Sequence, residues 1–404
     1  MLLSRLSPLR VHLGPWLTVV VLVAFFLGPF YWPGSSAAWV NFLRIGVLLA
    51  LMAMLWRGLP GYRPDAFQLC CLLFWGYLAG NAIFLGEEAQ AFRRLLFLLC
   101  FVGLVAMLDR HSRIWPIVLG FLALLGAGFA LLSLLNLYRL DQLVLGYRSG
   151  KVFSSGIPGI ADFGNTIVAA MHYAVCFCAA MWLFFSTRHR AALWLWGCCA
   201  LIIGCYVVLT YARSGWVACL VGAIVLLVTL FRRQRWRRSA LFVVGLLCVL
   251  VVFVGSYFGY ELSVRGVTYR DEIWSTVLSR VFDNWLWGYG AGAGLEPIVI
   301  RGGRQVVHNA HNLYLEVFYQ FGLVGLLFLL TVLSWALWRL ARMALGQREE
   351  PAVASFALAL LAAAAVVMLV ELNGFVSTPN LVWLWFWLPL GIALGCRGAS
   401  TVKY

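Results

Sequence analysis

The sequence predicts an all-α polytopic membrane protein with about 12 transmembrane helices. Three observations lead to this fold class. Of the 404 residues, 63% are hydrophobic and 11% are charged, and the mean hydropathy is +0.92, so the chain cannot present an ordinary polar surface to water. Apolar runs of about 20 residues, the length that crosses a bilayer, recur along the whole chain. Arginines gather in alternate connections between these runs.

The apolar runs predict the spans in order. The first run follows Arg5 and Arg10 and lacks a small-residue cleavage site, so it is interpreted as a span and not as a signal peptide. The fourth, from Leu95 to Leu108, is short unless the helix continues into its flanks. The predicted spans begin near Leu13, Trp39, Ala66, Leu95, Trp115, Phe163, Ala192, Gly215, Ala240, Leu313, Val353 and Leu381.

The placement of charge predicts the orientation. With the N-terminus in the cytoplasm, one side carries 18 of the 30 Lys and Arg but four of the 15 acids. The positive-inside rule therefore favours both termini in the cytoplasm. That side accounts for +14 (18 minus 4) of the net charge of +15. The basicity thus indicates topology and contact with membrane lipid, and no nucleic-acid partner is expected.

The 11 cysteines all fall in or at the ends of predicted spans. In that setting they are typical small apolar packing residues. Neither a disulfide framework nor a zinc site is expected.

Two connections on the outer side are long, 136–162 and 258–312, within a single integral membrane domain covering 1–404. The second keeps five arginines on the side where topology disfavours them. Arginines retained there indicate an anionic partner, unless each pairs with an acid of the same loop. The five are Arg265, Arg270, Arg280, Arg301 and Arg304.

The same loop predicts an amphipathic helix near 270–286. Ile273, Val277 and Val281 recur every four residues, Trp285 continues the series, and further apolar residues lie beside them. The glycine-rich stretch 287–294 follows and permits a tight turn, but no strand-turn-helix unit surrounds it, so it is not a dinucleotide fingerprint.

Arg213 lies between the seventh and eighth spans, in Thr-Tyr-Ala-Arg-Ser-Gly-Trp. Almost nothing separates these spans, so we expect Arg213 at the outer mouth of the bundle. It either binds an anionic group there or extends to lipid phosphate.

Two histidines, His308 and His311, end the second long loop in His-Asn-Ala-His-Asn-Leu-Tyr-Leu. A histidine at a helix N-terminus is disfavoured in its protonated form and is suited to accept a proton. The pair could also bind a metal, but no third or fourth ligand is evident, and no metal is expected.

Together these motifs resemble the O-antigen ligase and polymerase superfamily (WaaL and Wzy types). The resemblance rests on Arg213 in Ala-Arg-Ser-Gly-Trp, Arg270 in Arg-Asp-Glu-Ile-Trp, the 287–294 turn, and His311-Asn312 followed by Gly-Leu-Val-Gly at 322–325. It covers about 148–325 and implies a GT-C-like glycosyltransferase architecture. It also implies that His311, and not His308, is the functional histidine.

The resemblance, taken to the ligase type, implies a reaction at the periplasmic face of the bacterial inner membrane. The donor is undecaprenyl-pyrophosphate-linked O-antigen, and the acceptor is a sugar hydroxyl of lipid A-core. His311 acts as general base in an inverting, metal-independent transfer without a cofactor. Arg213, Arg270 and Arg265 bind the pyrophosphate. Rim or sugar contacts are expected from Arg148, Lys151, His308 and Asn312.

Three alternatives stay open. An O-antigen polymerase uses the same donor with a glycan acceptor, and a protein O-oligosaccharyltransferase of this superfamily uses a protein acceptor. A membrane transporter on the same scaffold would be expected to carry ionisable residues at the bilayer midplane and an internal repeat, and neither is evident in the sequence.

Overall fold

The structure is a computed structural model that describes most of the chain. Within that part the fold is almost entirely helical, with one small hairpin. The described residues are 7–56, 63–86, 89–108, 113–143, 149, 151–231, 269–300, 305–346 and 353–395.

Helices stand at 11 of the 12 predicted spans, and the ninth, from Ala240, lies outside the described residues. Seven of the described helices, α3 to α8 and α12, are long and apolar enough to cross a membrane, and shorter apolar helices occupy the other four positions. The chain is therefore a multi-pass membrane protein. The helices are α2 (Ser7–Leu27), α3 (Ser36–Leu55), α4 (Ala66–Phe84), α5 (Ala89–Ala106), α6 (Ile114–Arg139), α7 (Thr166–Ser186), α8 (Arg190–Leu209), α9 (Arg213–Phe231), α12 (Leu313–Gly346), α13 (Ala354–Val367), and η2 (Trp383–Trp387) continuing into α14 (Leu388–Gly395).

The fourth predicted span does continue into its flank, because α5 begins at Ala89. Its extra turn contains polar residues that are compatible with a helix. Arg94 donates through Nη2 to Gln90 Oε1 at 3.0 Å, a contact between side chains one turn apart.

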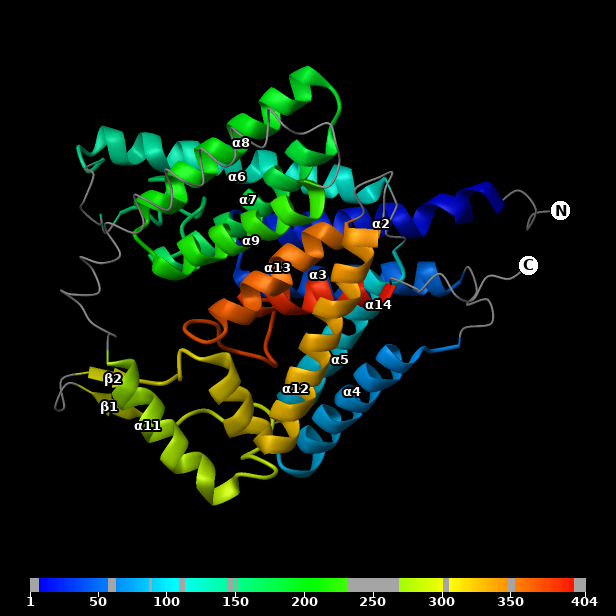
Figure 1. Ribbon diagram of the computed structural model, residues 1–404, viewed down its shortest axis with the longest axis vertical. Helices are drawn as coiled ribbons and strands as arrows, with labels where there is room; N and C mark the ends of the chain where they lie inside the picture. Colours follow the sequence, from blue (N-terminus) through cyan, green and yellow to red (C-terminus); the bar gives the residue numbers. More distant parts are fainter. Residues whose placement is uncertain are drawn as a thin grey trace.

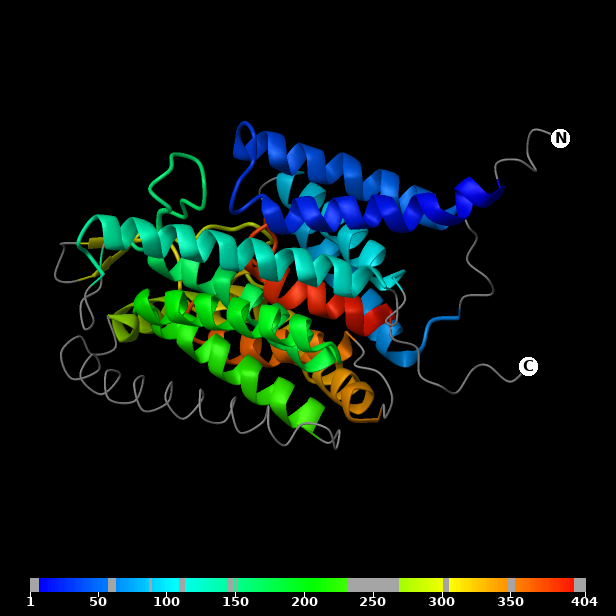
Figure 2. The same cartoon turned by 90° about the horizontal axis from the view of Figure 1, so that it is seen from above.

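Helix α7 is deeply buried and packs against α6, α8, α9 and α13 (Figure 1). Small residues such as Ala170 and Ala174 let α6, α8 and α9 pack closely against it. Seen from above, the start of α2 and the end of α14 lie at the same end of the bundle (Figure 2). Helix α11 (Arg270–Val281) and the strands β1 (Ile298–Ile300) and β2 (Gln305–Val307) lie at the opposite end, which we call the site end.

The first predicted outer loop starts later than expected, because α6 runs to Arg139. The loop that follows folds back onto the bundle. Tyr206 Oη donates to Val152 O at 2.7 Å, and Tyr31 forms an isolated bridge with Ile160.

The site end has a small core of its own. Ile273, Val277 and Val281, three positions of the apolar stripe, are buried against the hairpin. The helix ends at Val281, before the predicted 286, and a 3-10 turn, η1 (Phe282–Asn284), follows. Trp285 is about half exposed, and its carbonyl accepts the N–H of Leu323 at 2.7 Å instead of continuing a helix.

The β1–β2 hairpin is not part of the all-α prediction. Ile298 pairs with Val307 and Ile300 with Gln305 in antiparallel register. Ile298 and Ile300 face the small core and Val299 faces outward, which is the alternation typical of a half-buried strand.

Helix α12 is bent at Gly322, whose φ of 63° and ψ of −170° are accessible essentially to glycine alone. A Cβ at Gly322 would collide with the Leu286 carbonyl. The predicted span from Leu313 is thus divided into a short segment, 313–321, at the site end and a long one, 323–346, in the bundle. Figure 1 shows the yellow and orange segments meeting at this bend.

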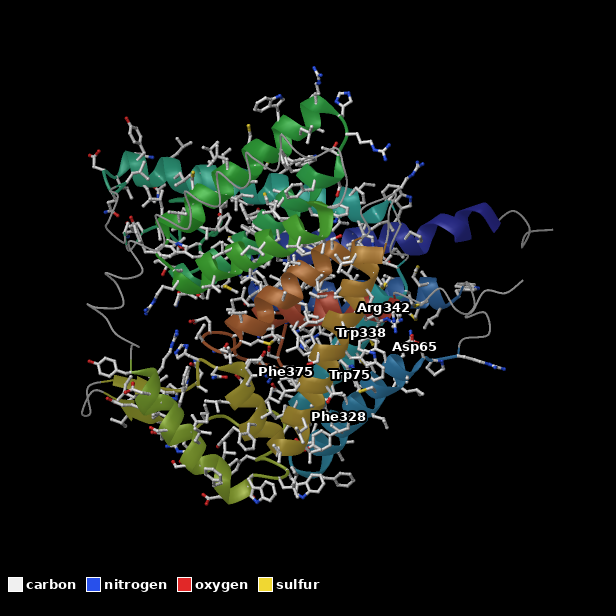
Figure 3. The ribbon with its side chains drawn as sticks, viewed as in Figure 1. Asp65, Trp75, Phe328, Trp338, Arg342 and Phe375 are labelled. Atoms are coloured by element: carbon white, nitrogen blue, oxygen red, sulfur yellow. The ribbon has the colours of Figure 1, made fainter. Side chains whose placement is uncertain are left out.

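At the end opposite the site end, an ion pair joins α4 to α12, and its acidic member, Asp65, is labelled in Figure 3. Arg339 Nη1 lies 2.6 Å from Oδ2 of Asp65, whose other oxygen caps α4 through the N–H of Gln68. The Arg339 guanidinium also lies over the Phe67 ring, 5.2 Å from its centroid. Both residues of this ion pair lie on the side that the sequence predicts to be cytoplasmic.

Candidate active site

His311 lies at the site end, two residues before α12 begins. Its φ is 46°, the left-handed region that side-chain-bearing residues rarely adopt. The backbone is held on both sides: Trp274 Nε1 donates to Ala310 O at 3.0 Å, and Asn312 Oδ1 caps α12 by accepting the N–H of Leu315 at 3.1 Å. The surrounding contacts therefore fix an otherwise unfavourable conformation that presents the imidazole.

Glu371 lies between the histidine and an arginine. Its Oε1 is 3.6 Å from His311 Nδ1, and its Oε2 accepts a hydrogen bond of 3.0 Å from Arg270 Nη2. The Glu371 side chain is 13% exposed. A carboxylate in this position favours a proton on Nδ1 and leaves Nε2 as the proton acceptor.

A second carboxylate holds the loop that carries Glu371. Glu316, buried on the first segment of α12, accepts the N–H groups of Gly374 (2.9 and 3.0 Å) and Phe375 (3.1 Å). The Phe375 ring packs against Phe74 and Trp387 in an aromatic cluster inside the bundle (Figure 3). Since backbone donors and a buried ring both fix this loop, Glu371 is presented from a defined position.

Two arginines give this end of the bundle its positive charge. The pKa of Arg270 is lowered from its ordinary value, first by burial, and proximity to Arg213 lowers it further, while Glu371 raises it. Arg213 is the first residue of α9 and follows Tyr211, which has a left-handed φ of 52°. A guanidinium carries a positive charge in proteins. The proximity of Arg213 to Arg270 therefore gathers positive charge beside Glu371, and such a gathering favours the approach of an anion.

A cavity of about 430 Å³ lies beside His311 and Glu371. Its walls come from α2, α3, α7, the segment before α12 and the loop after α13. The described residues that line it include four asparagines, two histidines and one glutamate but no lysine or arginine. The site thus has a cationic side, at Arg270 and Arg213, and a neutral to acidic side, at the cavity.

The structure does not bring all of the predicted site residues together. His308 is exposed, Asn312 is buried as the cap of α12, and neither lines the cavity. Lys151 is exposed on the loop after α6 and does not line it either. Arg148 and Arg265 lie outside the described residues. Among the described residues, no group of three or more His, Cys, Asp or Glu is arranged to hold a metal ion.

Sequence reasoning did not assign a role to Glu371 or to Glu316. A signal for Glu371 was present, because it is a single acid between two apolar runs, on the side predicted to hold Arg270. An ionisable residue in such a position indicates a partner. No local pattern in the sequence predicts which residue pairs with Glu371.

The fold and the site define a class: a multi-pass membrane protein that places a histidine–carboxylate pair beside an arginine pair at one end of its bundle. The comparison with known families makes this more specific. Residues 198–330, 133 of the 404, match the family model described as O-antigen ligase. The match confirms the resemblance predicted from the sequence, and residues 198–330 are similar to the O-antigen ligase family. It contains Arg213, Arg270 and His311, whereas Glu371 lies beyond it. No curated protein matches the chain.

Proposed function

We propose that this protein is an O-antigen ligase. It transfers a glycan from undecaprenyl pyrophosphate to a sugar hydroxyl of lipid A-core, at the periplasmic face of the bacterial inner membrane. The observation that carries the proposal is the arrangement of His311, Glu371 and Arg270 between a cationic face and a neutral cavity. This arrangement offers a base to an incoming hydroxyl and positive charge to a leaving anion.

In the proposed transfer, His311 acts through Nε2. Glu371 holds the proton on Nδ1, so that Nε2 accepts the proton of the acceptor hydroxyl as its oxygen attacks the anomeric carbon. The bond between that carbon and the phosphate oxygen breaks on the opposite side, which inverts the configuration. The 3.6 Å between His311 Nδ1 and Glu371 Oε1 is longer than a hydrogen bond, and catalytic hydrogen bonds are often long without substrate and tighten in the complex.

Arg270 and Arg213 would stabilise the leaving pyrophosphate. A guanidinium presents several N–H donors in a plane and binds phosphate oxygens in pairs. Glu371 engages Nη2 of Arg270 and orients its guanidinium. Charge that develops on the pyrophosphate is then neutralised by fixed arginines, which is why we expect the reaction to need no divalent cation or cofactor.

The same geometry serves an O-antigen polymerase, which differs in its acceptor. The test therefore uses purified protein, lipid-linked O-antigen and rough lipopolysaccharide, with and without a metal chelator. A ligase yields lipopolysaccharide carrying the O-antigen ladder in both conditions. Longer lipid-linked glycan without modified lipopolysaccharide would identify a polymerase. The absence of any new glycosidic product would contradict both enzymes and favour the transporter alternative.

A further inference from the structure

The cavity beside His311 has a mostly apolar lining interrupted by a few polar side chains, and the proposed chemistry leaves these polar groups unexplained. Its volume of about 430 Å³ is comparable to that of small-molecule binding sites, which span about 300 to 1,000 Å³. His311 and Glu371 form part of its lining, so whatever occupies it lies against the proposed base.

The charge of the lining excludes the anionic part of the donor. Among the described lining residues Glu371 is the one group that is negative at neutral pH, and no lysine or arginine joins it. A pyrophosphate here would face a carboxylate without a cation of its own, whereas Arg270 offers one on the other side of Glu371. The cavity therefore suits an uncharged group.

The polar atoms distinguish a sugar from an isoprenoid chain. Asn309 Oδ1 is buried and has no hydrogen-bond partner among the described residues. His172 Nδ1 lies 2.8 Å from Val168 O, which assigns the proton to Nδ1 and leaves Nε2 as an acceptor on a residue that lines the cavity. A hydrocarbon would leave the Asn309 oxygen unsatisfied, whereas a sugar hydroxyl would donate to it.

Aromatic rings supply part of the apolar surface of the cavity. Trp39 and Phe163 line the cavity, and the Trp39 ring is held by its Nε1, which donates to Ala24 O at 2.9 Å. Rigid aromatic rings facing a few convergent polar groups are typical of sites that bind ligands with one apolar and one hydroxyl-bearing face.

We infer that this cavity is the subsite for the acceptor saccharide, with Asn309 accepting a hydrogen bond from a sugar hydroxyl and Trp39 and Phe163 supporting the ring. The inference rests on the proposed function, because it assigns the two sides of His311 to the two substrates. The donor pyrophosphate binds on the arginine side. The neutral acceptor sugar enters from the cavity and presents its hydroxyl to Nε2 of His311.

The experiment combines two variants, Asn309→Leu and Val168→Phe, with two readouts. Asn309→Leu removes the accepting oxygen at similar size, and Val168→Phe fills the cavity from α7. Steady-state transfer gives the acceptor and donor KM separately, and equilibrium binding of a delipidated core oligosaccharide to the protein in detergent gives acceptor affinity without catalysis. Asn81→Leu is the matched control, since Asn81 Oδ1 is also buried without a described partner but does not line the cavity. Thermal unfolding verifies that each variant is folded.

For Asn309→Leu we expect the acceptor KM and the oligosaccharide Kd to rise about tenfold, the effect of one net hydrogen bond, with the donor KM unchanged. Val168→Phe should weaken binding of the acceptor further, and Asn81→Leu should leave the acceptor KM unchanged. A raised donor KM with unchanged acceptor KM in folded Asn309→Leu and Val168→Phe would overturn the assignment in favour of the prenyl chain.

The two readouts separate this subsite from the proposed function. Transfer by the wild type with no effect of Asn309→Leu would leave the ligase standing and remove the subsite. Binding of the oligosaccharide that depends on Asn309, without transfer by the wild type, would retain the subsite and remove the ligase. Absence of oligosaccharide binding to the wild type would overturn the subsite directly.

Discussion

Replacing Glu371 with glutamine removes the negative charge between His311 and Arg270 while keeping the size of the side chain. The carboxylate lies 3.6 Å from His311 Nδ1. At an effective dielectric constant of about 20, two full charges at that distance interact by about 5 kcal/mol. The imidazole is 34% exposed, so solvent screening reduces this interaction energy to about 2 kcal/mol. The proton is only partly transferred in the transition state, so Glu371 stabilises that state by about 1 to 2 kcal/mol. The expected loss is therefore about tenfold in kcat.

The donor KM of Glu371→Gln should not rise, because the substitution leaves Arg270 with less competition for an incoming anion. The assay is the initial rate of transfer to rough lipopolysaccharide at saturating donor and acceptor, followed by a donor titration. Glu296→Gln is the matched control: Glu296 is also a carboxylate at the site end, but its side chain is 79% exposed and its contact with Arg280 is 3.9 Å. A Glu371→Gln enzyme with wild-type kcat, or one whose only defect is a higher donor KM, would refute the reasoning.

Three further predictions concern the arginines, the bend and the loop. Arg270→Lys keeps the charge but loses the paired contacts with phosphate, so a donor titration should give a donor KM about tenfold higher. An unchanged donor KM would show that Arg270 has a structural role and does not bind the donor. Gly322→Ala forces a side chain into a conformation that is accessible essentially to glycine alone, so thermal unfolding should show a free energy of unfolding lower by about 1 to 3 kcal/mol. Gly346→Ala is the control, because a Cβ at Gly346 meets open space, and it should leave the stability unchanged. Equal stability of the two variants would contradict the bend. Glu316→Leu leaves the N–H groups of Gly374 and Phe375 unpaired and should cost about 2 to 6 kcal/mol, with lower activity in any protein that folds; wild-type stability would show that this carboxylate does not hold the loop.

Much of the fold follows from hydropathy, because the bilayer requires long apolar helices. The bend at Gly322 could not be predicted from hydropathy, because an apolar run that contains a glycine has the same sequence pattern whether the helix is straight or bent there. What decides the bend is the contact with the 285–288 backbone, where Trp285 O accepts the Leu323 N–H. The hairpin was missed because two three-residue strands carry little periodic signal.

The site was predictable where it follows from local motifs. The family resemblance favoured His311 over His308, and the structure places His311 against Glu371 while His308 is exposed. Charge placement pointed to five arginines of the outer loop, and the resemblance distinguished Arg270 among them. Its partner Glu371 lies 101 residues further along the chain, and no local pattern joins two such positions. Packing of α11, α12 and the loop after α13 creates that pair.

The most direct test of the central claim is the reconstituted transfer reaction with three proteins: the wild type, His311→Ala and His308→Ala. With lipid-linked O-antigen and rough lipopolysaccharide, in the presence of a chelator, the wild type and His308→Ala should both produce ladder-bearing lipopolysaccharide. Folded His311→Ala should produce none, because no other described group holds an acceptor nitrogen beside both Glu371 and the cavity. Ladder formation by His311→Ala at the wild-type rate would contradict the assignment of the base.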